Sequence, residues 1–164
     1  CASQAPGRRL HHRPPNGSTA LAYDLFAFDL FAAPRDRYDF LDWVSRTFRD
    51  ADCGSGGDAS RTTAPLRAWH RDMAQGFPGR RDPHALDDDD PAAVRLATYR
   101  FTQGIVQASF HWYSSGPALY RARRSAQTCG VGLFEASGHD GSVWMMSSRG
   151  RFEIVHRGDD AVRA

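Results

Sequence analysis

Hydrophobic and polar residues alternate along several stretches of the chain with the two-residue period of β-strands. Segment 21–31 carries apolar side chains on both of its faces, which predicts an inner strand. Segments 94–101 and 104–112 predict a hairpin, 131–136 a further strand, and 143–146 with 151–155 a C-terminal hairpin. The residues expected to face the core from the first hairpin are Ala97, Tyr99, Phe101, Val106, Ala108, Phe110 and Trp112.

Other segments repeat apolar residues at the spacing of amphipathic helices. Segment 33–49 predicts a helix with Pro34 in its first turn, because proline fits the first helical position. A second helix is expected to follow Thr63 as its N-cap and to end near Gly76. A third helix is expected to begin near Ser115 and to end before Gly130. Four of its side chains are expected to face the core: Leu119, Ala122, Ala126 and Cys129.

The order β, α, α, β, β, α, β predicts an α+β fold with a mainly antiparallel sheet and helices on one face. We interpret it as a ferredoxin-like βα(α)ββαβ core extended by a C-terminal hairpin. One domain is expected over 21–156, with a disordered tail at 1–20 and a short tail at 157–164. Residues 1–20 are rich in proline, glycine and arginine without apolar periodicity, which is typical of a disordered segment.

The net charge of +2 is concentrated in the predicted tail, which carries Arg8, Arg9 and Arg13 and no acid. The remaining 18 arginines are balanced by 19 acidic residues, which leaves 18 − 19 = −1 for residues 21–164. A nucleic-acid-binding domain concentrates positive charge on its folded part, so we expect no nucleic-acid partner. With 24% charged residues interspersed among the apolar ones, the sequence also predicts no membrane span.

The 3 cysteines, Cys1, Cys53 and Cys129, are too few and too widely separated for a disulfide framework or a closed zinc site. We therefore predict a cytoplasmic protein that holds no metal and no cofactor. An alternative is lipid anchoring, because a chain that opens with Cys1 followed by Ala-Ser resembles a processed bacterial lipoprotein.

Four separated segments of the chain agree in order with one family: YDLFAFDLFAAPRDRYDFLDW, APLRAWHRDM, FHW and GVGLFEASGHDGSVW. Together they resemble a small family of uncharacterised bacterial proteins, and the resemblance covers about 23–144. It implies no established activity. The association of such small domains with bacterial toxin–immunity repertoires makes an immunity-like or adaptor role the expectation it carries.

An aspartate run at Asp87, Asp88, Asp89 and Asp90 is the most conspicuous charged feature of the sequence. Adjacent carboxylates cannot all point at one ion, whereas calcium loops place their ligands at alternating positions. We interpret the run as a solvated loop that offers a negative rim to a basic partner.

The outward face of the predicted hairpin carries Arg100, Gln107, Ser109 and His111. We treat these residues as a contact surface for a protein partner, which predicts a non-enzymatic binding module. The alternative is a small enzyme that uses His111 as an acid or base together with Arg100. The sequence favours binding, because no second ionisable residue is spaced recognisably to assist His111, and no glycine-rich phosphate loop or nucleophile elbow occurs.

Two other clusters are interpreted structurally. Ser137, His139 and Asp140 lie within one Asp-Gly turn, whereas catalytic triad members need separate supports. The arginines of the third helix, Arg121, Arg123 and Arg124, lie opposite its apolar stripe and are expected to face solvent.

Overall fold

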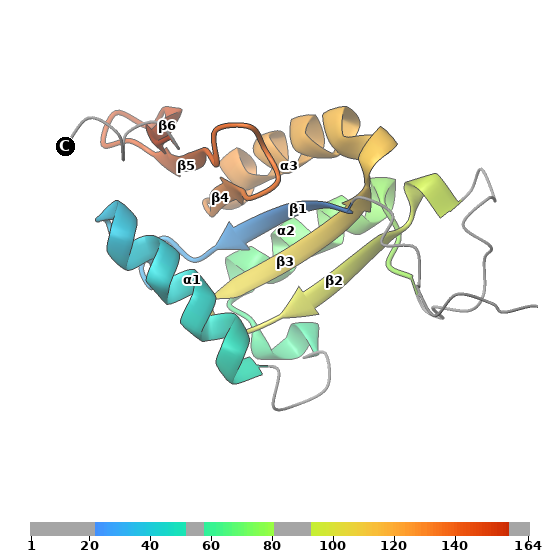
Figure 1. The fold of residues 1–164 in the computed structure, drawn as a ribbon, viewed down its shortest axis with the longest axis horizontal. Coiled ribbons are helices and arrows are strands. Elements are labelled where there is room, and N and C mark those ends of the chain that lie inside the picture. The colour runs from blue at the N-terminus through green and yellow to red at the C-terminus, as the bar shows by residue number, and fades with distance from the viewer. Residues whose placement is uncertain (1–21, 52–57, 81–92, 158–164) are drawn as a thin grey trace, which may run out of the picture.

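The computed structural model describes residues 22–51, 58–80 and 93–157. These residues form one six-stranded sheet in the order β2-β3-β1-β4-β5-β6, and its neighbouring strands pair antiparallel (Figure 1). The α+β class and the antiparallel sheet are thereby confirmed, while the ferredoxin-like assignment stays a prediction. The main elements are β1 (Ala22–Phe28), α1 (Arg37–Ala51), α2 (Ala64–Gly76), β2 (Ala97–Phe101), β3 (Ile105–His111), α3 (Ser115–Cys129), β4 (Gly132–Glu135), β5 (Val143–Met146) and β6 (Phe152–His156), with short 3-10 turns η1 (Ala59–Arg61), η2 (Ala93–Arg95) and η3 (Trp112–Ser114).

Strand β1 lies inside the sheet, between β3 and β4, as its two apolar faces predict. Leu25 and Ala27 are fully buried on one face, and Phe28 is fully buried on the other. Burial on both faces explains why the segment lacks the apolar–polar alternation of an edge strand.

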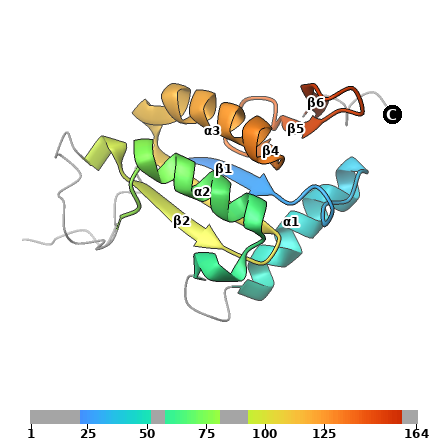
Figure 2. The same ribbon diagram turned by 180° about the vertical axis from the view of Figure 1, so that it is seen from behind.

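Helices α2 and α3 lie side by side over one face of the sheet (Figure 2), which we call the α2/α3 face. Trp69 of α2 is fully buried there, and its indole nitrogen donates a hydrogen bond of 3.2 Å to the carbonyl of Ala122. Ala118, Ala122 and Ala126 of α3 are also fully buried, and their small side chains let the indole reach the α3 backbone. This face holds the larger core cluster.

Helix α1 packs on the opposite face, which we call the α1 face. Phe40 is fully buried, and its ring centroid lies 4.9 Å from that of Phe28 and 5.6 Å from that of Phe134. The predicted placement of helices on one face therefore holds for α2 and α3, whereas α1 covers the other. The physical reason is that Phe26 and Phe28 point to that face and need cover.

The starts of two helices refine the sequence predictions. Helix α1 begins at Arg37, and Pro34 lies before it; the Asp36 carboxylate accepts hydrogen bonds from the backbone N–H groups of Tyr38 at 2.9 Å and Asp39 at 3.2 Å. Asp36 is thus the N-cap of α1. Thr63 stands at the predicted N-cap of α2, but its side chain makes no capping bond.

The end of β3 differs from the prediction. The strand stops at His111, and Trp112 begins η3 and is 45% exposed instead of facing the core. The chain turns there because the His111 ring nitrogen Nδ1 accepts a hydrogen bond of 3.3 Å from the backbone N–H of Tyr113.

The third helix fits its predicted bounds closely. Gly130 caps its end with a φ of 70°, a left-handed conformation that favours glycine. Its buried stripe comprises Ala118, Ala122, Ser125 and Ala126. Leu119 and Cys129, predicted to face inward, are only partly buried and pack at the edge of the cluster.

Candidate functional site

The α1 face of the sheet is divided into an apolar half and a polar half. Helix α1 packs against the apolar half, which includes Phe28 and Ile105. Farther along the same strands, no helix of the described chain lies in front of the sheet (Figure 1). We call this half the polar strand face; the strand register places Asp24, Thr98, Arg100, Gln107, Ser109 and His111 on it.

Hydrogen bonds join neighbouring side chains of the polar strand face. The Asp24 carboxylate accepts a short bond from the Ser109 hydroxyl and a bond of 3.4 Å from the Gln107 amide. The Gln107 carbonyl in turn accepts a bond of 3.5 Å from the Arg100 guanidinium, which lies 5.4 Å from the ring centroid of Phe48 in α1. The structure thus brings three of the predicted residues, Arg100, Gln107 and Ser109, into one network.

His111 is not bonded into this network. It lies opposite Ala22, whereas Arg100 lies opposite Gln107, so the two backbones are about 13 Å apart along the strand direction. The His111 ring also stacks on Tyr113, with centroids 5.2 Å apart. The pair that the enzyme hypothesis needs is therefore not brought together.

Asp24 is the residue of this network that sequence reasoning did not select. The apolar residues on both faces of segment 21–31 predicted only an inner strand, so Asp24 was not considered as a surface residue. The sequence did contain a signal for it: Asp24 is a carboxylate within an otherwise apolar strand, and such a group needs hydrogen-bond donors close by. Its donors come from β3, which lies far along the chain from β1.

The remaining predicted positions are structural or lie elsewhere. The aspartates Asp87 to Asp90 are outside the described residues. The Ser137 hydroxyl accepts a hydrogen bond of 2.9 Å from the Asp24 N–H and donates one of 3.4 Å to the Ala22 carbonyl. Ser137 therefore anchors the turn after β4 to β1, which agrees with the turn interpretation of this segment.

A buried tyrosine lies on the other face of β1. The Tyr23 hydroxyl donates a hydrogen bond of 2.6 Å to the Glu135 carboxylate. Burial raises the pKa of Tyr23 far above its ordinary value, and the neighbouring Glu135 raises it further, so Tyr23 remains a neutral donor. Both residues border a cavity of about 480 Å³, together with Trp112 and His139.

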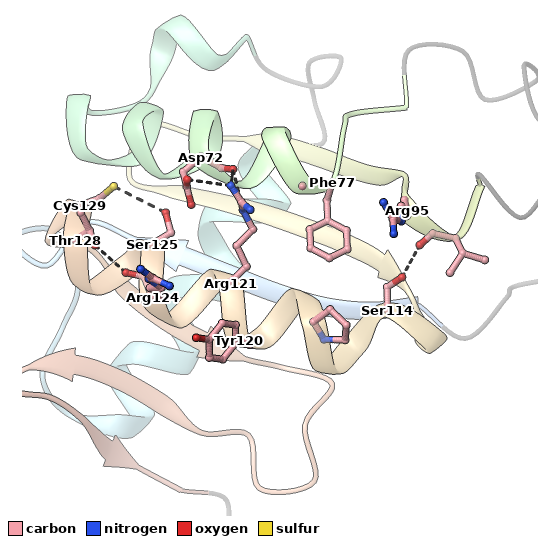
Figure 3. Close-up of a pocket in the computed structure, with 13 residues that line it drawn as sticks. Asp72, Phe77, Arg95, Ser114, Tyr120, Arg121, Arg124, Ser125, Thr128 and Cys129 are labelled. Atoms are coloured by element: carbon pink, nitrogen blue, oxygen red, sulfur yellow. Dashed lines mark hydrogen bonds and ion pairs between the residues drawn. The ribbon is translucent and has the colours of Figure 1, made fainter.

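A larger cleft, of about 720 Å³, lies between α2 and α3 (Figure 3). Arg121 and Arg124 line it; Arg124 is exposed, as the helix pattern predicts, whereas Arg121 is only partly exposed. Arg121 reaches across to α2 and donates hydrogen bonds of 3.0 and 2.8 Å to the Asp72 carbonyl. No signal in the sequence could reveal the cleft, since it depends on how two helices pack.

Resemblance to known proteins does not assign a function to these features. No protein-family model matches this chain, and no curated protein or solved structure matches it either. Within the described residues, no group of three or more histidine, cysteine or acidic side chains could hold a metal ion. Nor does any helix there have the length and apolar character needed to cross a membrane. Functional inference therefore rests on the geometry of the surface.

Proposed function

We propose that the chain is a non-enzymatic binding module that docks a protein partner on its polar strand face. The observation that carries the proposal is the network of Asp24, Ser109, Gln107 and Arg100 on a part of the sheet that α1 leaves uncovered. These mutual bonds orient polar groups over several strands, an arrangement suited to a broad contact surface. Preorganised side chains lose less entropy when a partner binds.

Aromatic residues at the end of β3 extend this surface. Tyr113 is 83% exposed and stacks on His111, which belongs to the polar strand face. Tyrosine is enriched at protein interfaces because it offers a rigid apolar ring with a polar end. A polar surface with an exposed tyrosine beside it fits a protein partner.

The enzyme alternative has less support. The Nδ1 atom of His111 accepts the Tyr113 backbone bond, and the Asp24 carboxylate is engaged by Ser109 and Gln107. A general acid–base pair needs the two groups within hydrogen-bond reach of one reacting bond, and Arg100 lies too far along the strand from His111. We therefore rank binding first and retain a small enzyme using His111 and Arg100 as the second candidate.

The kind of partner follows from charge. The run from Asp87 to Asp90 would attract a basic protein, and the −1 balance of residues 21–164 disfavours nucleic acid. An immunity-like or adaptor role in the cytoplasm accounts for a small domain of this type. Neutralising the four aspartates should slow association with the partner, most strongly at low salt, since long-range attraction is screened by ions.

The test is to purify products of the genes that flank the coding sequence and measure their binding to the full chain by biolayer interferometry. We expect Tyr113→Ala to speed dissociation of the partner about tenfold. The matched control is Tyr38→Ala, which removes another exposed tyrosine, at 64% exposure, from α1. A turnover activity that disappears in His111→Ala, with no partner bound at any salt concentration, would favour the enzyme instead.

A further inference from the structure

We propose that the cleft between α2 and α3 binds a small organic phosphate with a planar apolar body, about the size of a nucleoside monophosphate. Its volume of about 720 Å³ lies within the range of small-molecule sites. The cleft lies across the helices of the α2/α3 face (Figure 3), while the polar strand face is on the other side of the sheet. The inference therefore does not depend on the proposed protein partner.

Positive charge dominates the lining of the cleft. It contains Arg95, Arg121 and Arg124 but a single acid, Asp72. Asp72 forms an ion pair of 3.1 Å with Arg121, so its charge is already matched. Arg95 and Arg124 are exposed and make no ion pair with a carboxylate of the described chain. The uncompensated charge favours an anion, and guanidinium groups match the oxygens of phosphate particularly well.

Arg121 is held in place before any ligand arrives. Its Nε and one Nη bind the Asp72 carbonyl, and these bonds leave the other Nη group unengaged by Asp72. Gly76 permits this arrangement, because a Cβ there would lie 3.1 Å from the Arg121 Cδ. A fixed arginine binds an anion at a lower entropic cost than a mobile one. Figure 3 shows Arg95 and Arg124 toward opposite ends of the cleft, with Arg121 between them.

The rest of the lining explains why we expect an organic phosphate and not a bare ion. Phe77 is buried at the wall of the cleft, and Val94 and Pro117 add further apolar surface. The ring of Tyr120 is 69% exposed and can stack on a planar group. Phosphate suits several arginines because it carries close to two negative charges and three strong acceptor oxygens at neutral pH.

The experiment is isothermal titration calorimetry of the full chain with adenosine monophosphate, adenosine and inorganic phosphate. We expect one bound adenosine monophosphate per chain, weaker binding of phosphate, and no measurable binding of adenosine. One of the variants Arg124→Gln and Arg95→Gln should weaken adenosine monophosphate at least about tenfold, as expected for a lost charged hydrogen bond, and the other should weaken it less, because the two arginines lie toward opposite ends of the cleft. The matched control is Arg71→Gln, an exposed arginine of α2 that does not line the cleft, and it should bind as the wild type does.

Two calorimetric results would overturn the assignment. One is the absence of binding by adenosine monophosphate to the wild-type chain. The other is an equal loss of affinity in Arg71→Gln and Arg124→Gln, which would indicate attraction to net charge only. Amide chemical-shift mapping on the wild-type chain supplies a second measurement that needs no variant. Shifts at Tyr120, Arg121 and Thr128 support the cleft, and shifts confined to other elements contradict it.

Discussion

Helices α2 and α3 both pack over one face of the sheet, whereas α1 packs alone over the other. The α2/α3 face is built from a large indole, Trp69, set against the small residues of α3. The α1 face is built from aromatic rings in edge contact, such as Phe28 with Phe40, and it ends where the polar network of Asp24 begins. One face is therefore a continuous core, and the other combines a smaller core with the polar strand face.

This difference places most of the stability and most of the proposed chemistry in different layers. Burial of apolar area is the main source of folding free energy, so the face with more buried residues contributes more. A face that leaves polar groups at the surface contributes less stability but can contact a partner. Changes to the two faces should therefore be separable by experiment, and three sets of substitutions test this from the largest expected effect to the smallest.

The largest effect is expected from a pair of tryptophan substitutions, one on each face. Trp69→Ala removes a fully buried indole and should lower the free energy of unfolding by about 3–5 kcal/mol. Trp43→Ala on α1 should cost clearly less, because Trp43 is only partly buried at the edge of its cluster. Urea unfolding followed by circular dichroism measures both values. Equal losses would show that the two faces contribute equally to the free energy of unfolding, which would contradict the expected difference between them.

The α2/α3 face was largely predictable from the sequence because its signals are local. The spacing of Leu66, Trp69, His70 and Met73 identifies the apolar stripe of α2; Leu66, Trp69 and Met73 are fully buried, and His70 is partly buried. The position of α1 was not predictable in the same way. Its apolar stripe requires a covering surface, but a stripe does not say which face of the sheet provides it; that choice depends on where Phe26 and Phe28 point after the sheet has formed.

The candidate sites show the same limit. Alternation along 104–112 placed Gln107, Ser109 and His111 on one strand face, and the structure keeps them there. Their bonding partner Asp24 comes from a strand distant in sequence, so only the sheet register reveals it. The cleft is less predictable still, because Arg95 of η2 and Arg121 of α3 line one cleft only in the packed structure, where α3 lies beside α2.

An intermediate effect is expected at a close contact within the α1 face. A Cβ at Gly132 would lie 2.2 Å from the buried ring of Phe28, so Gly132→Ala must displace that ring from its contact with Phe40. We expect a loss of about 1–3 kcal/mol in the free energy of unfolding, as for an overpacked core. Phe28→Leu combined with Gly132→Ala should recover part of the loss, because the two sites are in contact.

A matched glycine substitution isolates the steric part of that result. Gly116 lies in α3 and has no neighbour within 4 Å of the Cβ position, so Gly116→Ala should stabilise the protein by about 0.5–1 kcal/mol through helix propensity. Destabilisation of similar size in both variants would mean that the Phe28 contact is not the cause of the loss at Gly132. The α1 face would then be more tolerant than its aromatic packing indicates.

The smallest effect is a pH dependence located at the edge of the α2/α3 face. His70 packs between Tyr99 and Phe101, with ring centroids 4.6 and 4.8 Å away, and burial lowers its pKa below the ordinary value of 6.5. Between the lowered and the ordinary pKa, the unfolded chain binds more protons than the folded chain. The free energy of unfolding should therefore fall as the pH falls below about 6.5 and should level off below the folded pKa.

Urea unfolding at several pH values should show a shallower fall in His70→Gln, and an unchanged profile in His139→Gln, whose imidazole is exposed. If the free energy of unfolding fell identically with pH in the wild type and in His70→Gln, the titrating groups would lie elsewhere. The pH dependence would then not distinguish the α2/α3 face from the α1 face.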